Sequence, residues 1–174
     1  LLLARSLQAR GESAIVLEKS RGFGGRLAVK RVGEAVFDSG AQFLTARDPA
    51  FAALVEDWRK AGLLAAWPGS DSRFIGRPAM NAVPKALAEG LAVLREHKVT
   101  AARHDGAGWM LELENRSPLA AHRLVLTCPV PQALALLDAG GATLPGALRE
   151  ALNRLTYHPC LALLVTLDGP SRVP

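Results

Sequence analysis

A short apolar run that ends in an acid and leads into a glycine-rich segment constrains the fold of this chain most. Residues 13–18 read Ser-Ala-Ile-Val-Leu-Glu, without alternation of polar and apolar side chains. Such a run predicts a strand buried on both faces of a parallel sheet, with Glu18 at its carboxyl end. The preceding residues 1–10 predict a helix that stops at Gly11. This order matches the second half of a βαβ nucleotide-binding unit, in which the acid accepts hydrogen bonds from a ribose.

The segment after the acid is suited to contact phosphate. Residues 19–26 read Lys-Ser-Arg-Gly-Phe-Gly-Gly-Arg. Gly24 and Gly25 permit positive φ and close backbone approach, and the Arg26 guanidinium offers a fixed fork of donors. Leu27 occupies the last glycine position of a G-x-G-x-x-G pattern, so the segment is not itself the dinucleotide fingerprint. It is either a second phosphate contact or a plain flexible turn.

Net charge and cysteine spacing exclude several classes of function. The chain has 21 basic and 16 acidic residues, a formal charge of +5, which favours an anionic partner. Its arginines are scattered and only 5% of its residues are aromatic, a poor match to a nucleic-acid groove. Cys128 and Cys160 show no metal-ligand spacing, so we expect no metal site, and reduced thiols favour a cytoplasmic location. No apolar run approaches the roughly 20 residues that span a bilayer.

Local patterns predict the other elements. Asp48 is an N-cap with Pro49 as the first residue of a helix that ends at Gly62. Residues 109–114 alternate apolar and polar side chains, which predicts a half-exposed antiparallel strand. The apolar runs 123–128 and 161–167 predict two further strands, the first in the interior of the parallel sheet.

Several strings in the same order resemble one family. They are residues 16–26, followed by Phe-Asp-Ser-Gly-Ala-Gln-Phe-Leu-Thr-Ala-Arg-Asp at 37–48, Gly-Arg-Pro-Ala-Met at 76–80, Ala-Val-Pro at 82–84 and Thr-Cys-Pro-Val-Pro-Gln-Ala at 127–133. Together they resemble the FAD-dependent amine-oxidase superfamily and, within it, the renalase-like NAD/FAD-dependent oxidoreductases. The resemblance implies an α/β fold, with a Rossmann-like FAD-binding parallel sheet and a second, mixed α+β substrate region.

The resemblance also implies domain limits. Residues 1–45 and 80–138 would form the FAD-binding domain, and residues 46–79 and 139–174 the substrate domain. The family's first-turn G-x-G-x-x-G belongs before Leu1, and its closing flavin-binding segment belongs after Pro174. No N-cap precedes the helix at residues 1–10, so we expect residues upstream to be missing from this sequence. The resemblance implies that both domains are incomplete.

The resemblance assigns most of the candidate site residues. Glu18 would bind the adenosine ribose hydroxyls, and the Gly24-Gly25-Arg26 loop would face the pyrophosphate. The backbone of Val99 would contact adenine. Gly40, Ala41 and Gln42 would lie beside the flavin ring, and Lys19 completes the cofactor set.

Arg77 is the candidate for an anionic group of the substrate, because a Gly-Arg-Pro turn can hold a guanidinium at the mouth of a cleft. A plain surface arginine is the alternative. No catalytic residue is predicted.

The predicted function is that of an FAD-dependent oxidoreductase acting on a small molecule. By resemblance it takes a hydride from a reduced nicotinamide species, NAD(P)H, or from an amine, with O2 as acceptor. The flavin performs the redox chemistry, so the protein need only bind, orient and desolvate the reactants. Two alternatives stay open, namely an inactive flavoprotein fragment that serves as a binding module and a flavin-free NAD-binding protein. The sequence predicts no membrane or nucleic-acid partner and leaves the oligomeric state unknown.

Overall fold

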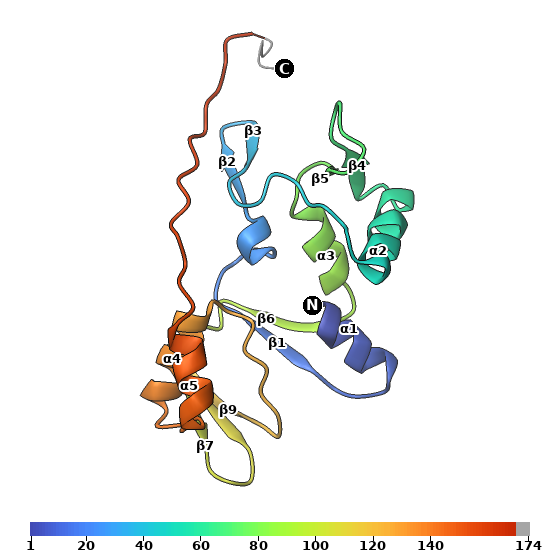
Figure 1. Cartoon of the computed structure of the whole chain (residues 1–174). Coiled ribbons are helices and arrows are strands. Elements are labelled where there is room, and N and C mark those ends of the chain that lie inside the picture. Colours follow the sequence, from blue (N-terminus) through green and yellow to red (C-terminus); the bar gives the residue numbers. More distant parts are fainter. Residues whose placement is uncertain (170–174) are drawn as a thin grey trace. The chain divides into compact units, whose positions relative to one another are not determined.

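The computed structural model describes residues 1–169 of a mixed α/β chain that divides into two compact units (Figure 1). The first unit comprises residues 1–16, 22–93 and 161–169. The second comprises residues 17–21 and 94–160. The last five residues of the predicted substrate domain, 170–174, lie outside the described residues. The predicted FAD and substrate domains are defined by ligands, so this division does not test their limits.

The strand predicted before the glycine loop is present. β1 (Ile15–Glu18) pairs with β6 (Ala92–Arg95), and both strands pass from the first unit into the second in chain order, so they run parallel. Burial on both faces was wrong, since Ile15 is 61% exposed and no residue of β1 is buried. Within residues 1–169 only β6 pairs with β1. The other edge of β1 has no neighbouring strand in the described part of the chain, so the pair does not form the interior of a larger sheet.

An arginine ties two helices of the first unit together. α1 (Leu2–Ala9) ends before Gly11, whose φ of 75° lies in the left-handed region that glycine tolerates, as predicted. The Arg5 guanidinium of α1 donates hydrogen bonds of 2.7–3.0 Å to the carbonyls of Ala86, Leu87 and Glu89 at the end of α3 (Ala82–Ala88). Gln8 donates to the Gly90 carbonyl at 2.9 Å. These bonds satisfy carbonyls that a helix end otherwise leaves unpaired.

The predicted helix after Asp48 is confirmed as α2 (Pro49–Lys60). The Asp48 carboxylate accepts a hydrogen bond from the Phe51 backbone N–H at 3.0 Å and so caps the helix. Val55 on its apolar face is 2% exposed and packs with Leu64 and Val83 in a core.

Two hairpins that the sequence did not predict complete the first unit. β2 (Val29–Val32) pairs with β3 (Ala35–Asp38), and β4 (Leu64–Ala66) pairs with β5 (Phe74–Gly76), both antiparallel. Met80 is fully buried beside them, and its backbone N–H donates to the Asp38 carboxylate at 2.9 Å.

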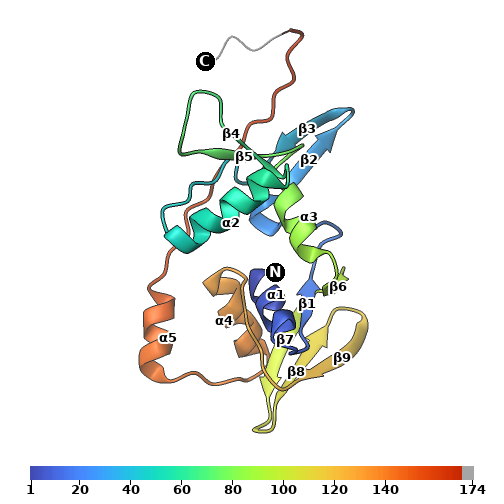
Figure 2. The same cartoon turned by 90° about the vertical axis from the view of Figure 1, so that its right-hand side faces the viewer.

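The second unit is a three-stranded antiparallel sheet with a helix against it (Figure 2). β7 (Val99–His104), β8 (Trp109–Leu113) and β9 (Arg116–Ala121) follow in order, and α4 (Val130–Ala139) packs on β7. The alternation predicted for β8 is confirmed, because Leu111 and Leu113 are buried while Met110 and Glu112 are exposed. Ala102, Leu111, Leu137 and Ala142 form the core of this unit.

The final helix, α5 (Gly146–Asn153), buries none of its own side chains. Arg149 forms a bidentate ion pair with Asp138 of α4, in which Nη1 lies 3.1 Å from Oδ2. The hydrogen bond from Arg149 lowers the pKa of the exposed Asp138 carboxyl below its ordinary value.

Two predicted strands were wrong. Residues 123–128 and 161–167 form no strand. Their apolar side chains are not enclosed either, since Val125 is 59% exposed and Leu161 is 98% exposed. A strand requires a partner that accepts and donates its backbone hydrogen bonds. No segment within residues 1–169 pairs with either run, and an apolar pattern alone cannot supply one. The described helices include none that is long and apolar enough to cross a membrane.

Candidate cofactor-binding site

The predicted phosphate loop is a tight turn in the first unit. Gly24 and Gly25 have φ values of 126° and 50°, and residues Gly25–Leu27 form a single 3₁₀ turn. The Leu27 backbone N–H closes it with a hydrogen bond of 2.7 Å to the Gly24 carbonyl. Arg26, within this turn, is exposed. The turn therefore requires glycine at both positions, because residues with a side chain rarely adopt such positive φ values.

Gly40 packs directly on this turn. Its N–H donates to the Ala28 carbonyl at 3.1 Å, and the Ala41 N–H donates to the Arg26 carbonyl at 2.8 Å. A Cβ added at Gly40 would lie 2.1 Å from the Arg26 carbonyl oxygen, so only glycine fits there. We call Gly24, Gly25, Arg26, Gly40 and Ala41 the glycine cradle. The structure thus brings together two predicted segments that are separated in the sequence.

Glu18 stands at the end of β1 in the second unit, where a neighbouring serine orients its carboxylate. Its Oε1 accepts hydrogen bonds from the Ser20 backbone N–H at 2.8 Å and from the Ser20 Oγ at 2.6 Å. Both bonds use the same oxygen. Among the described residues Oε2 therefore remains available to a ligand hydroxyl.

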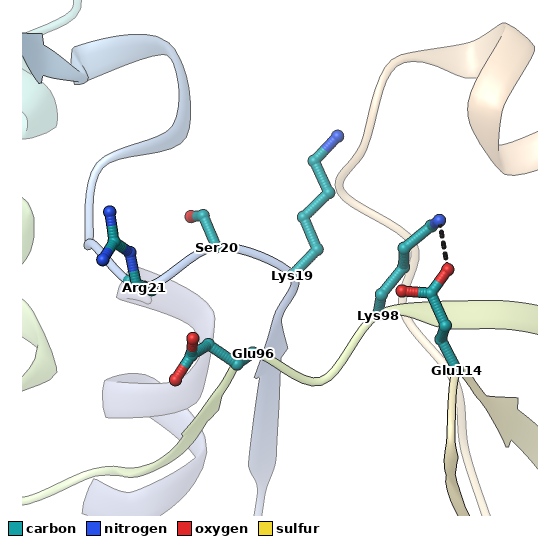
Figure 3. Close-up of a pocket in the computed structure, with 6 residues that line it drawn as sticks. All are labelled: Lys19, Ser20, Arg21, Glu96, Lys98 and Glu114. Carbon is teal, nitrogen blue, oxygen red and sulfur yellow. Dashed lines mark hydrogen bonds and ion pairs between the residues drawn. The ribbon is translucent and has the colours of Figure 1, made fainter.

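Beside Glu18 the second unit has an open hollow of about 430 Å³, which we call the charged hollow (Figure 3). Lys98 and Glu114 form an ion pair of 2.6 Å. Figure 3 draws this pair as a dashed line and shows Lys19 extending from the end of β1. Val99, the predicted adenine contact, begins β7 directly after Lys98. The residues that line the hollow are Lys19, Ser20, Arg21, Glu96, Lys98 and Glu114.

The predicted site residues are divided between the units. Glu18, Lys19 and Val99 belong to the second, and the glycine cradle, Gln42 and Arg77 belong to the first. Arg77 directly follows β5, and its backbone N–H donates to the Leu63 carbonyl at 2.8 Å while its side chain is exposed. This placement neither supports nor contradicts a substrate contact.

Sequence reasoning missed Ser20 and the Lys98–Glu114 pair. A serine two residues after an acid is a local signal that could have indicated the first, because such side chains form short-range turns. The second depends on the pairing of β7 with β8 and could not be found from local spacing. Within residues 1–169 no group of three or more His, Cys, Asp or Glu side chains could hold a metal ion.

Comparison with known proteins first defines the fold class. The fold resembles that of a putrescine oxidase triple mutant with redesigned cofactor binding, with a TM-score of 0.60 and 12% sequence identity. The similarity covers 86% of this chain, which spans 59% of the length of that structure. The chain therefore has a mixed α/β fold like that of an amine oxidase.

The sequence comparison then gives the family. The model of the flavin containing amine oxidoreductase family matches residues 1–65 and 59–173. These ranges cover nearly the whole sequence, so the chain belongs to this family. The superfamily predicted from the sequence motifs is confirmed.

Proposed function

We propose that this chain contributes FAD-binding surfaces to a renalase-like, flavin-dependent oxidoreductase with a Rossmann-like cofactor domain. A reduced nicotinamide species or an amine would donate the hydride, and O2 would accept the electrons. The observation that carries the proposal is the glycine cradle, because the backbone contact of Gly40 with the Arg26 turn, which only glycine allows, holds Arg26 next to the predicted flavin-ring segment. Membership of a flavin-containing family supports it.

The residues present fit FAD chemically. At Gly25 a Cβ would meet no atom within 4 Å, so a ligand could approach the backbone there, and Arg26 would offer a guanidinium for the negative charge of a diphosphate. Glu18 offers Oε2 to a ribose hydroxyl while Ser20 holds Oε1. The backbone of Val99 would contact adenine, with Lys19 beside it at the charged hollow.

Bound FAD supplies the redox chemistry through its ring. The chain's own residues bind and orient it. Gly40, Ala41 and Gln42 would flank the ring, and Arg77 would hold an anionic group of a small-molecule substrate. We place the protein in the cytoplasm as part of the same proposal.

Purified protein tests the proposal directly. Visible flavin absorption, or stabilisation by added FAD of about 2.7 kcal/mol at 100 times the dissociation constant, is the expected result. A colourless protein that FAD does not stabilise would contradict it. Stabilisation by NAD alone would favour the flavin-free alternative.

Single substitutions test the two assigned contacts. Glu18→Ala and Arg26→Ala should each weaken FAD binding about tenfold without unfolding the chain, because both side chains would contact ligand and neither is buried. Glu34→Ala and Arg31→Ala are matched controls, since both residues are exposed on the β2–β3 hairpin. Equal FAD affinity in all four variants and the parent would contradict the assignment.

A further inference from the structure

A single carboxylate links two of the predicted site segments within the first unit. Asp38 is the last residue of β3, and Gly40 of the glycine cradle follows two positions later. The Asp38 Oδ1 accepts a partly buried hydrogen bond of 2.9 Å from the Met80 backbone N–H, across 42 positions of the sequence. Met80 lies three positions after Arg77, the candidate for the anionic group of the substrate. The bond therefore joins the flavin-ring side of the predicted site to its substrate side.

Residues 76–80, which include Arg77, form a tightly closed turn that we call the arginine turn. The Gly76 N–H donates to the Met80 Sδ at 3.1 Å, and Met80 is fully buried. A Cβ added at Gly76 would lie 2.2 Å from the Ala79 carbonyl oxygen, so the turn is as tight as glycine allows. Because these contacts lie within the turn, a shift of Met80 would move Arg77 with it.

The backbone around Asp38 is held to the Arg26 turn. The next residue, Ser39, donates from its Oγ to the Ala28 carbonyl at 3.2 Å, and the Gly40 N–H donates to the same carbonyl at 3.1 Å. Within residues 1–169 no other hydrogen bond of the arginine turn reaches residues 38–42. Asp38 therefore supplies the direct hydrogen bond between the arginine turn and the segment that contains the predicted flavin-ring residues.

The chemistry of this hydrogen bond suits a positioning role. A carboxylate that accepts a backbone N–H forms a stronger bond than a neutral acceptor does. Met80 is fully buried, so removal of the carboxylate would leave a buried donor unpaired. We propose that Asp38 is a positioning residue that holds Arg77 in place relative to the flavin-ring residues 40–42. This inference rests on the proposed function, which assigns these two groups to substrate and flavin, and adds the residue that fixes their relative position.

Amide hydrogen exchange of the full chain, followed residue by residue by NMR, tests the inference. Asp38→Ala removes the acceptor, so we expect the Met80 amide to exchange about tenfold faster. The Gly40 and Ala41 amides should also exchange faster, because their segment loses its bond to the arginine turn. Asp38→Asn keeps a carbonyl oxygen at the same position and should restore slow exchange at all three amides. The loss of one hydrogen bond should leave the chain folded.

Asp48→Ala is the matched control. The Asp48 carboxylate also accepts a backbone N–H in the first unit, that of Phe51 at 3.0 Å. Its removal should speed amide exchange in the first turn of α2. The amides of Met80, Gly40 and Ala41 should exchange as in the parent, because Asp48 has no bond to the arginine turn.

The outcomes separate this inference from the proposed function. In Asp38→Ala, unchanged exchange at Gly40 and Ala41 would overturn it, and so would an equal rise throughout the first unit. Exchange in Asp38→Asn as fast as in Asp38→Ala would overturn it too. These results can be obtained even if the protein binds no FAD. If FAD binds, its visible circular dichroism should change in Asp38→Ala and return to the parent signal in Asp38→Asn, and an unchanged signal in Asp38→Ala would overturn the inference.

Discussion

The glycine cradle and the charged hollow are both candidate nucleotide-binding surfaces, yet they are built from different parts of the chain. In the glycine cradle, backbone N–H groups of Gly40 and Ala41 donate to backbone carbonyls of the Arg26 turn. In the charged hollow, side chains carry the contacts, namely Ser20 to Glu18 and Lys98 to Glu114.

This difference determines how each surface responds to substitution. A backbone contact tolerates most changes of side chain but none that adds a Cβ where two chain segments touch. A side-chain contact can be removed one hydrogen bond at a time, and exposed ion pairs weaken in salt. A single substitution should therefore disrupt the glycine cradle, whereas the charged hollow should lose its contacts one at a time.

Gly40→Ala should have the largest effect. The new Cβ would lie 2.1 Å from the Arg26 carbonyl oxygen, so the turn must move away. We expect the free energy of unfolding to fall by roughly 1–3 kcal/mol, as for other overpacked sites, and FAD binding to be lost. Denaturant unfolding and FAD titration measure the two effects.

Gly22→Ala is the matched control for that change. It lies in the same unit, and a Cβ there would meet no atom within 4 Å. Its stability should stay within about 0.5 kcal/mol of the parent, as for ordinary surface changes. If both variants lost the same stability, the close approach of Gly40 would not be what holds the glycine cradle together.

Ser20→Ala should have an intermediate effect on the second surface. It removes the 2.6 Å Oγ bond to Glu18 but keeps the 2.8 Å backbone bond, so the carboxylate loses part of its orientation. FAD affinity should fall about fivefold, which corresponds to one net hydrogen bond. Ser20→Thr retains a hydroxyl and should restore the affinity. An affinity in Ser20→Ala equal to that of the parent would show that Glu18 needs no such support.

Lys98→Gln should have a small effect that depends on salt. The Lys98–Glu114 pair is about half exposed, so its loss should reduce the free energy of unfolding by about 0.5 kcal/mol or less. Repeating the thermal unfolding in 1 M salt should remove the difference, while Lys85→Gln on α3 should show none at either salt concentration. A salt-independent loss would mean that Lys98 acts through packing instead.

Acidification should have the smallest effect, at α5 rather than at either surface. The pKa of Asp138 is lower in the folded chain than in the unfolded chain, so its contribution to folding is present above the ordinary aspartate pKa. That contribution is lost as the pH falls from about 4 through the lower folded value. Circular dichroism should show Asp138→Asn to be less helical than the parent at neutral pH and equal to it in acid. Asp71→Asn, in an exposed loop, should match the parent throughout, and a gap that widened in acid would contradict the sign.

Local sequence signals predicted the elements whose causes are local. Asp48 and Pro49 begin α2 because the cap and the first turn lie within a few residues, and the alternation of β8 follows from its two faces. The apolar runs 123–128 and 161–167 have the side chains of strands, but strand formation depends on distant partners. The short β2–β3 and β4–β5 hairpins also depend on the pairing of their strands, and no local pattern predicted that pairing.

The candidate site shows the same limit. The resemblance of the sequence motifs to a family supplied most of the candidate site residues. Glu18 ends β1 as predicted. The contact between Gly40 and the Arg26 carbonyl joins segments that are 14 positions apart in the sequence. The ion pair of Lys98 with Glu114 requires a strand register that includes an irregularity between Val99 and Ala101. Neither arrangement follows from spacing.

The hydrogen bonds of Arg5 bear on where this protein can be shortened. No strand lies before β1, so a shortened version that begins near Ser13 would keep every strand of the described residues. It would also strip three carbonyls at the end of α3 of their guanidinium donor. The helix α1 thus caps a helix some 80 positions later. A shortened version of the protein should therefore carry another hydrogen-bond donor for these carbonyls.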